Sequence, residues 1–174
     1  LRKSAIEYQQ ASKWPLIFQE DYESGVTLPG MTSFPREMAL GAANSPELAF
    51  EYGKGVTLEA KSVGVKWVLH PVADLNLNQF NPITNVRSVS DDPQRAIRLL
   101  SNQIRGLQSH GVAATIKHFP GDGVDYRDQH LTTTTNSLAW SEWKRNHGAV
   151  FQALIDSGIS CIMPGHITLP AYQK

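Results

Sequence analysis

The chain has 174 residues, of which 41% are hydrophobic and 18% charged, and these proportions indicate a globular domain with a sizeable core rather than a disordered segment. Lysine plus arginine and aspartate plus glutamate both number 16, so no overall charge draws the chain to nucleic acid or to an anionic membrane. No apolar run approaches the roughly 20 residues that span a bilayer, and a small neutral ligand fits this composition best.

Seven elements alternate along the chain, and the spacing of apolar residues predicts each of them. Four are apolar runs of strand length and three are helical patterns. In chain order we expect a strand at 15–18, a helix at 46–63, a strand at 66–72, a helix at 95–109, a strand at 112–116, a helix at 139–157 and a strand at 159–163. Ser45 before Pro46 and Asp92 before Pro93 are typical helix starts. A glycine follows each helix and leads into the next strand.

Strands joined by helices imply a parallel sheet with right-handed crossovers, which is either a doubly wound open sheet or a (β/α)8 barrel. Neither G-x-G-x-x-G nor G-x-x-x-x-G-K-[ST] follows a strand, so a nucleotide-binding open sheet loses its main support. A complete barrel takes about 250 residues, whereas this chain holds about four strands. We therefore expect an α/β fold in which residues 1–174 form one partial barrel domain, truncated at about half.

The tryptophans and the single cysteine are expected to serve structure. Trp14 and Trp67 lie just before or within strands and are expected in the core. Trp140 and Trp143 are three apart, a spacing that places both on one helix face and favours packing against the sheet. Cys161 stands among apolar neighbours, which predicts a buried thiol without a disulfide partner.

Polar side chains gather where the predicted strands end. Ligands bind at the carboxyl ends of the strands in both candidate folds, so these residues indicate a pocket. In chain order they are Asp21 after the first strand, Asp74 and Arg87 after the second, Lys117 and His118 at the end of the third, and His166 after the fourth.

The stretch from Lys117 to His130 is the richest in groups that do chemistry, and it reads KHFPGDGVDYRDQH. Its composition alone fits a functional loop and a solvated loop equally well. The stretch resembles the K-H-F-P-G-x-G…D-x-H signature of family 3 glycoside hydrolases, in their β-N-acetylglucosaminidase branch. Asp21-Tyr22-Glu23-Ser24-Gly25 resembles the family's D-x-E-G-G turn, and further likeness extends the match over roughly residues 15–170. The resemblance implies the N-terminal half of a (β/α)8 barrel.

Roles for individual residues follow from this resemblance. It implies that His130 is the general acid/base and that Asp128 is its partner, and an imidazole that titrates near neutrality suits that task. It also implies that four residues hold the sugar beside the cleaved bond: Asp21, Arg87, Lys117 and His118. A structural ion pair between Arg87 and Asp21 is the alternative. Asp74 and His166 face the same site, either as substrate-binding residues or as satisfied polar groups.

The sequence departs from the family pattern at two places and has no candidate for one catalytic group. Asp122 stands where many relatives have histidine, and Ser24-Gly25 replaces two glycines. A retaining mechanism needs a carboxylate nucleophile, which the family carries on a later strand. The nucleophile is therefore expected outside these residues, and the chain alone is expected to be inactive.

The expected substrate is a carbohydrate with a terminal β-linked N-acetylglucosamine. The rival interpretations are a phosphorylase of the same family and a non-catalytic sugar-binding protein. We expect no metal and no other cofactor, because H-x-x-x-H and paired-cysteine motifs are absent, and no nucleic-acid or membrane partner. The sequence predicts no particular oligomeric state. No signal peptide is visible, which favours a cytoplasmic protein, although the start at Leu1 leaves secretion open.

Overall fold

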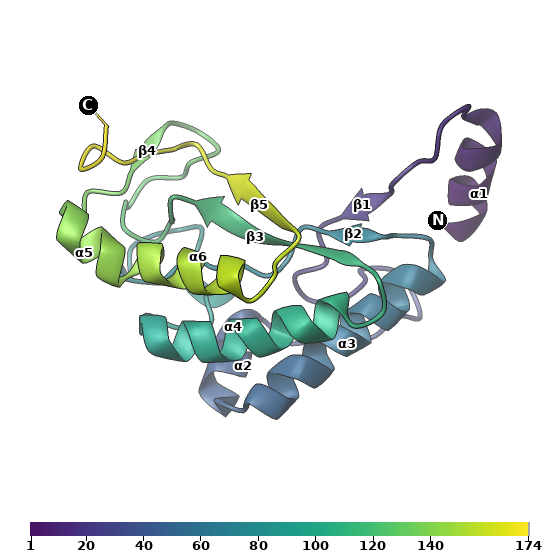
Figure 1. The fold of residues 1–174 in the computed structure, drawn as a ribbon, viewed down its shortest axis with the longest axis horizontal. Coiled ribbons are helices and arrows are strands. Elements are labelled where there is room, and N and C mark those ends of the chain that lie inside the picture. Colours follow the sequence, from purple (N-terminus) through teal and green to yellow (C-terminus); the bar gives the residue numbers. More distant parts are fainter. Residues whose placement is uncertain (174) are drawn as a thin grey trace.

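Four parallel strands form the main sheet of the computed structural model, which describes residues 1–173 (Figure 1). They lie in chain order: β1 (Gln19–Glu20), β2 (Trp67–Val68), β3 (Ala113–Phe119) and β5 (Cys161–Pro164). Trp67 pairs with Ala113, and Ile116 pairs with Ile162. A second parallel pair joins β4 (Thr134–Thr135) to β6 (Ile167–Thr168). The parallel order confirms the predicted β-α-β arrangement.

Three helices pack together and cover one face of this sheet (Figure 1): α3 (Pro46–Ser62), α4 (Pro93–Gln108) and α6 (His147–Asp156). The other described helices are α1 (Arg2–Ala11), α2 (Glu37–Ala43) and α5 (Trp140–Arg145), with a 3₁₀ turn, η1 (Asn85–Arg87). The predicted helix starts are confirmed. Ser45 Oγ accepts a bond from the Leu48 amide, and an Asp92 carboxylate oxygen accepts one from Gln94 N at 2.7 Å.

Four expectations about local structure are wrong. The first strand begins at Gln19, after the apolar run at 15–18, because only there does the chain pair with β2. Trp14 is 69% exposed and belongs to no core cluster. The predicted helix at 139–157 is two helices, because the backbone of Asn146 leaves the helical region (φ −103°, ψ −104°). Cys161 is partly exposed, since its strand forms the edge of the sheet.

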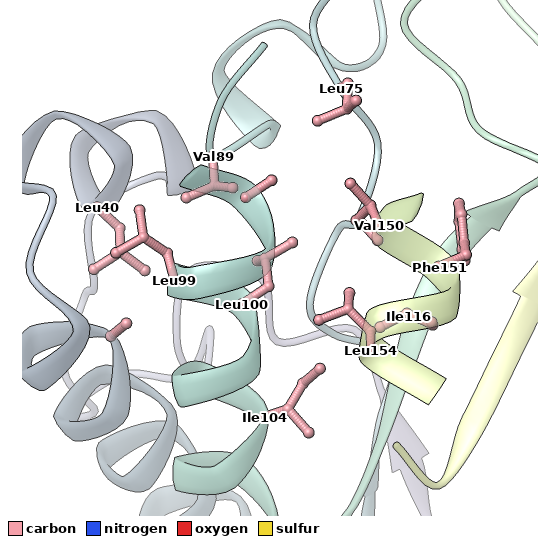
Figure 2. Packing of buried hydrophobic residues seen from close by; sticks show 13 residues of the cluster. Leu40, Leu75, Val89, Leu99, Leu100, Ile104, Ile116, Val150, Phe151 and Leu154 are labelled. Atoms are coloured by element: carbon pink, nitrogen blue, oxygen red, sulfur yellow. The ribbon is translucent and has the colours of Figure 1, made fainter. Parts of the chain in front are cut away.

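The hydrophobic core sits between the helices and the sheet. The residues labelled in Figure 2 include Leu99, Leu100 and Ile104 from α4, Ile116 from β3, and Val150 and Leu154 from α6. A second cluster joins α3 to β2 through Val56 and Val68. Both clusters hold the strands in a fixed register, so the residues that follow the strand ends are presented at one edge.

None of the helices in residues 1–173 is long and apolar enough to span a bilayer.

Candidate active site

The residues predicted from the strand ends lie at the carboxyl edge of the parallel sheet. Asp21 directly follows β1, and Lys117 and His118 belong to the last part of β3. Asp74 follows Val72, which pairs with Lys117. His166 comes two residues after β5, and Arg87 is the last residue of η1.

Two cations and two carboxylates form an ionic cluster at this edge. Lys117 is only 1% exposed, and its Nζ lies 2.6 Å from Asp21 Oδ1 and 2.7 Å from Glu23 Oε1. Arg87 donates from Nε to Glu23 Oε2 at 2.8 Å and from Nη2 to Glu23 Oε1 at 2.6 Å. The alternative of an Arg87–Asp21 ion pair is therefore wrong, because Arg87 pairs with Glu23.

Glu23 is the member of this cluster that the sequence interpretation overlooks. Burial raises the pKa of Glu23, but bonds from Arg87 and the charge of Lys117 outweigh it and lower the pKa to about 2. The hydroxyl of Tyr52 on α3 donates a hydrogen bond to the backbone carbonyl of Glu23 at 2.8 Å, which helps to hold Glu23 in place. One signal was present: Asp21 and Glu23 are two residues apart, the spacing that puts side chains on one side of an extended segment.

Asp74 is a buried carboxylate whose partners are protein groups. His118 Nδ1 donates to its Oδ2 at 2.7 Å, while the amides of His118 and Asp122 donate to its Oδ1 at 3.0 and 2.7 Å. Burial raises the pKa of Asp74, but the bonds from His118 and the two amides lower it by more. The pKa of Asp74 therefore lies below its ordinary value. Asp74 thus orients His118, and Nε2 is the ring nitrogen that remains available to a ligand.

His130 and Asp128 form a pair on the loop that follows β3. His130 donates to one Asp128 oxygen twice, from the ring Nδ1 at 2.7 Å and from the backbone at 2.8 Å. Both bonds lower the pKa of Asp128, and the backbone bond has the larger effect. The His130 side chain is 62% exposed, so its Nε2 can exchange protons with a substrate or with water.

The dyad loop, residues 120–133, is tied to the rest of the site. Asp125 accepts bonds from Arg127 and from the Thr135 amide at 2.8 Å. The backbone amide of His166 donates to the side-chain oxygen of Gln129 at 3.1 Å, whereas the His166 side chain is exposed. A Cβ on Gly165 would lie 2.8 Å from that oxygen and 2.9 Å from His118 Cβ. The dyad loop, the His166 turn and His118 therefore meet at Gly165.

Comparison with other sequences identifies relatives of the chain. Residues 2–174 match the family described as Glycosyl hydrolase family 3 N terminal domain. A beta-N-acetylglucosaminidase/beta-glucosidase of Cellulomonas fimi is 37% identical over 168 residues, which are 95% of this chain and 30% of that protein. A beta-hexosaminidase of Nitrosomonas eutropha is 32% identical over 166 residues, which are 90% of this chain and 47% of that protein.

Solved structures agree with this relationship. A beta-glucoside phosphorylase bound to 2FGlc has a TM-score of 0.95 and 39% identity, over 98% of this chain and 31% of that one. A family 3 beta-N-acetylglucosaminidase from a Paenibacillus species has a TM-score of 0.94 and 35% identity, over 98% and 34%. This chain thus spans half or less of the length of these relatives. The likeness confirms the predicted α/β barrel-type fold. The chain belongs to glycoside hydrolase family 3, and the match to the family's N-terminal domain extends over residues 2–174.

Proposed function

We propose that the complete protein is a retaining β-N-acetylhexosaminidase that removes terminal β-linked N-acetylglucosamine, with His130 as general acid/base. The observation that carries the proposal is the 2.7 Å bond between His130 Nδ1 and Asp128, on a loop that Gln129 ties to the turn of His166 after β5. Asp128 fixes the proton on Nδ1 and stabilises the imidazolium. The exposed Nε2 then gives a proton to the leaving oxygen and later takes one from water.

Four residues hold the sugar in this proposal: Asp21, Arg87, Lys117 and His118. Charged donors and acceptors grip hydroxyl groups through charge-assisted hydrogen bonds. The Asp21 side chain is 53% exposed although it touches Lys117, so a sugar hydroxyl has access to it. Asp74 contributes through His118, and His166 borders the same edge through its backbone bond to Gln129.

We place the carboxylate nucleophile outside residues 1–174. A retaining enzyme needs this group on the face of the sugar opposite the acid/base. Glu23 and Asp74 are already committed to Arg87, Lys117 and His118. We therefore expect the polypeptide 1–174 alone to leave an aryl N-acetyl-β-glucosaminide intact, and measurable turnover would contradict the assignment.

Replacement of His130 tests the proposed acid/base. In the complete protein, His130→Ala is expected to lower kcat for an aryl N-acetyl-β-glucosaminide by about 10²- to 10⁴-fold, the range that general acid–base catalysis contributes. His110→Ala is the control, because His110 follows α4 at the opposite edge of the sheet. Unchanged kcat in His130→Ala would refute the role. Sugar binding without turnover by the parent protein would instead indicate a sugar-binding protein.

Phosphorolysis is the second candidate, because a phosphorylase is among the most similar solved structures at 39% identity. A neutral histidine repels an incoming phosphate anion less than a carboxylate acid/base would. The two reactions differ in their products. Release of sugar 1-phosphate when phosphate is added means phosphorolysis, and free N-acetylglucosamine in both conditions means hydrolysis.

A further inference from the structure

A buried chain of hydrogen bonds runs beneath the dyad loop and has no part in the roles assigned above. Asn81 Nδ2 donates to Asp122 Oδ1 at 2.8 Å, and Gln129 Nε2 donates to Asp122 Oδ2 at 2.6 Å. All three side chains are buried. Gln129 stands between Asp128 and His130 in the sequence, so this chain of bonds ends inside the proposed dyad.

Both ends of the chain are attached to parts of the site. At one end, Asn81 Oδ1 accepts bonds from the amides of Ile83 and Thr84 at 2.9 and 2.7 Å, and the Thr84 carbonyl accepts the Arg87 amide. At the other end, Gln129 Oε1 accepts the His166 amide at 3.1 Å. The bonds therefore connect the turn that carries Arg87 with the loop that carries His130 and with the turn after β5.

The direction of every bond in this chain is fixed by backbone donors. An amide N–H can only donate, so Ile83 and Thr84 require the oxygen of Asn81 and turn its nitrogen towards Asp122. The His166 amide likewise requires the oxygen of Gln129 and turns its nitrogen towards Asp122. Position 122 receives donors from both sides. A carboxylate accepts on both, whereas an amide carries an NH₂ group on one of them.

We propose that Asp122 and Gln129 are positioning residues that set where His130 stands over the sugar site. The inference rests on the proposed function, because it assumes that His130 transfers the proton. Asp122 and Gln129 touch no substrate in this scheme. They hold the backbone between Asp128 and His130 at a fixed place relative to the Arg87 turn, and the close contact of Gly165 with Gln129 and His118 leaves little room for another arrangement.

Asp122→Asn tests the inference in the complete protein. The amide is nearly the same size, but its NH₂ group must face a donor. It loses the bond from Gln129 in one orientation, and the bonds from Asn81 and the Gly123 amide in the other. Gln129→Ala removes the bond between positions 122 and 129 from the other side. This second variant is used if Asp122→Asn folds poorly. The matched control is Gln108→Ala, because Gln108 likewise bridges two segments, the end of α4 and the turn at Gly158 and Ser160, at the other edge of the sheet.

The readout is kcat/KM for two N-acetyl-β-glucosaminides, one with a poor alkyl leaving group and one with a 2,4-dinitrophenyl leaving group. The good leaving group departs with little help from an acid. A misplaced His130 is therefore expected to lower the rate for the alkyl glycoside at least about tenfold more than for the dinitrophenyl glycoside. Gln108→Ala is expected to keep the parent ratio.

The outcomes separate this inference from the function on which it depends. If the parent protein turns over both glycosides and the two variants lose both activities equally, or lose neither, the positioning role is wrong while the proposed function stands. If the parent protein turns over neither glycoside, the proposed function itself fails, and the positioning role fails with it.

Discussion

At the scale of residues, the site uses one arrangement twice. His118 and His130 each donate from Nδ1 to a carboxylate at 2.7 Å, which leaves Nε2 of each ring to face other partners. The His118 pair is buried, whereas the His130 side chain is 62% exposed. In the proposed function, burial suits His118, which would hold the sugar in one geometry, and exposure suits His130, which would exchange protons with water.

Asp74→Asn is expected to weaken the grip of His118. The amide offers one oxygen where the carboxylate offered two. The backbone amides of His118 and Asp122, at 3.0 and 2.7 Å, then compete with the His118 ring for that oxygen. If the NH₂ group then faces the ring, His118 must accept at Nδ1 and carry its proton on Nε2. On the proposed function, we expect kcat/KM of the complete protein for an aryl N-acetyl-β-glucosaminide to fall about 10- to 100-fold, the usual effect of losing a partner that orients another residue. An unchanged value would show that Asp74 does not control His118.

Glu23→Gln is expected to remove a pH-dependent part of the stability. Its folded pKa of about 2 lies below the ordinary 4.5, so its contribution is present above pH 4.5 and lost as the pH falls towards 2. This difference corresponds to on the order of 3 kcal/mol in the free energy of unfolding. Urea unfolding between pH 6 and 3 measures this contribution. In Glu23→Gln, the free energy of unfolding should depend less steeply on pH over this range.

Glu51→Gln is the control for that experiment, because Glu51 pairs with Lys54 on the exposed surface of α3. Such surface pairs contribute little to stability. The control should therefore keep the pH dependence of the parent protein. An equal change in both variants would mean that Glu23 has no special place in the ionic cluster.

The predicted site residues and the overlooked ones differ in a physical way. Asp21, Lys117 and His118 follow from their place at strand ends, because parallel strands bring those ends to one edge. Asp122 and Gln129 bond to protein groups 41 and 37 positions away in the sequence, at Asn81 and His166. Such contacts depend on how loops fold back on the sheet, and no local spacing reports them.

At the scale of elements, caps and glycines made the long helices predictable, but packing decided the rest. The break before α6 has a clear cause in the structure. It places His147, the first residue of α6, in the interior, where its Nε2 bonds to the Asp122 carbonyl at 2.8 Å. Burial lowers the pKa of His147, which favours the neutral ring there. The apolar spacing of residues 139–157 does not depend on this tertiary bond, so the sequence pattern could not predict the break.

Close packing of α3 on α4 predicts that Gly53→Ala and Gly106→Ala destabilise the protein. A Cβ at these positions would lie 2.2 Å from the Gln103 carbonyl oxygen and 2.1 Å from the Phe50 carbonyl oxygen. The helices must separate, at a cost of about 1–3 kcal/mol that opposes the gain of about 1 kcal/mol in helix propensity. Thermal unfolding measures the net effect.

Gly55→Ala is the matched control in the same helix. Its new Cβ would meet only the Phe34 ring, at 2.8 Å, and a side chain moves aside more easily than backbone. We therefore expect the melting temperature to fall less for Gly55→Ala than for Gly53→Ala. The reverse order would show that α3 and α4 tolerate a wider separation.

At the scale of the whole molecule, the described sheet has two edge strands, β1 and β5. Ile162 on β5 is 41% exposed, although it pairs with Ile116. At the end of β5, a groove of about 720 Å³ is lined by Pro164, Trp140, Trp143 and Tyr172 among others. An edge strand with apolar side chains pairs readily with another chain.

We therefore expect the polypeptide 1–174, prepared by itself, to self-associate through β5 at micromolar concentrations. Sedimentation velocity measures this association. Ile162→Lys should shift the polypeptide towards monomer, because a charged side chain on an edge strand opposes pairing. Leu58→Lys places the same charge at a 47% exposed position on α3 and should leave association unchanged. Equal effects of the two variants would point to general solubility instead of strand pairing.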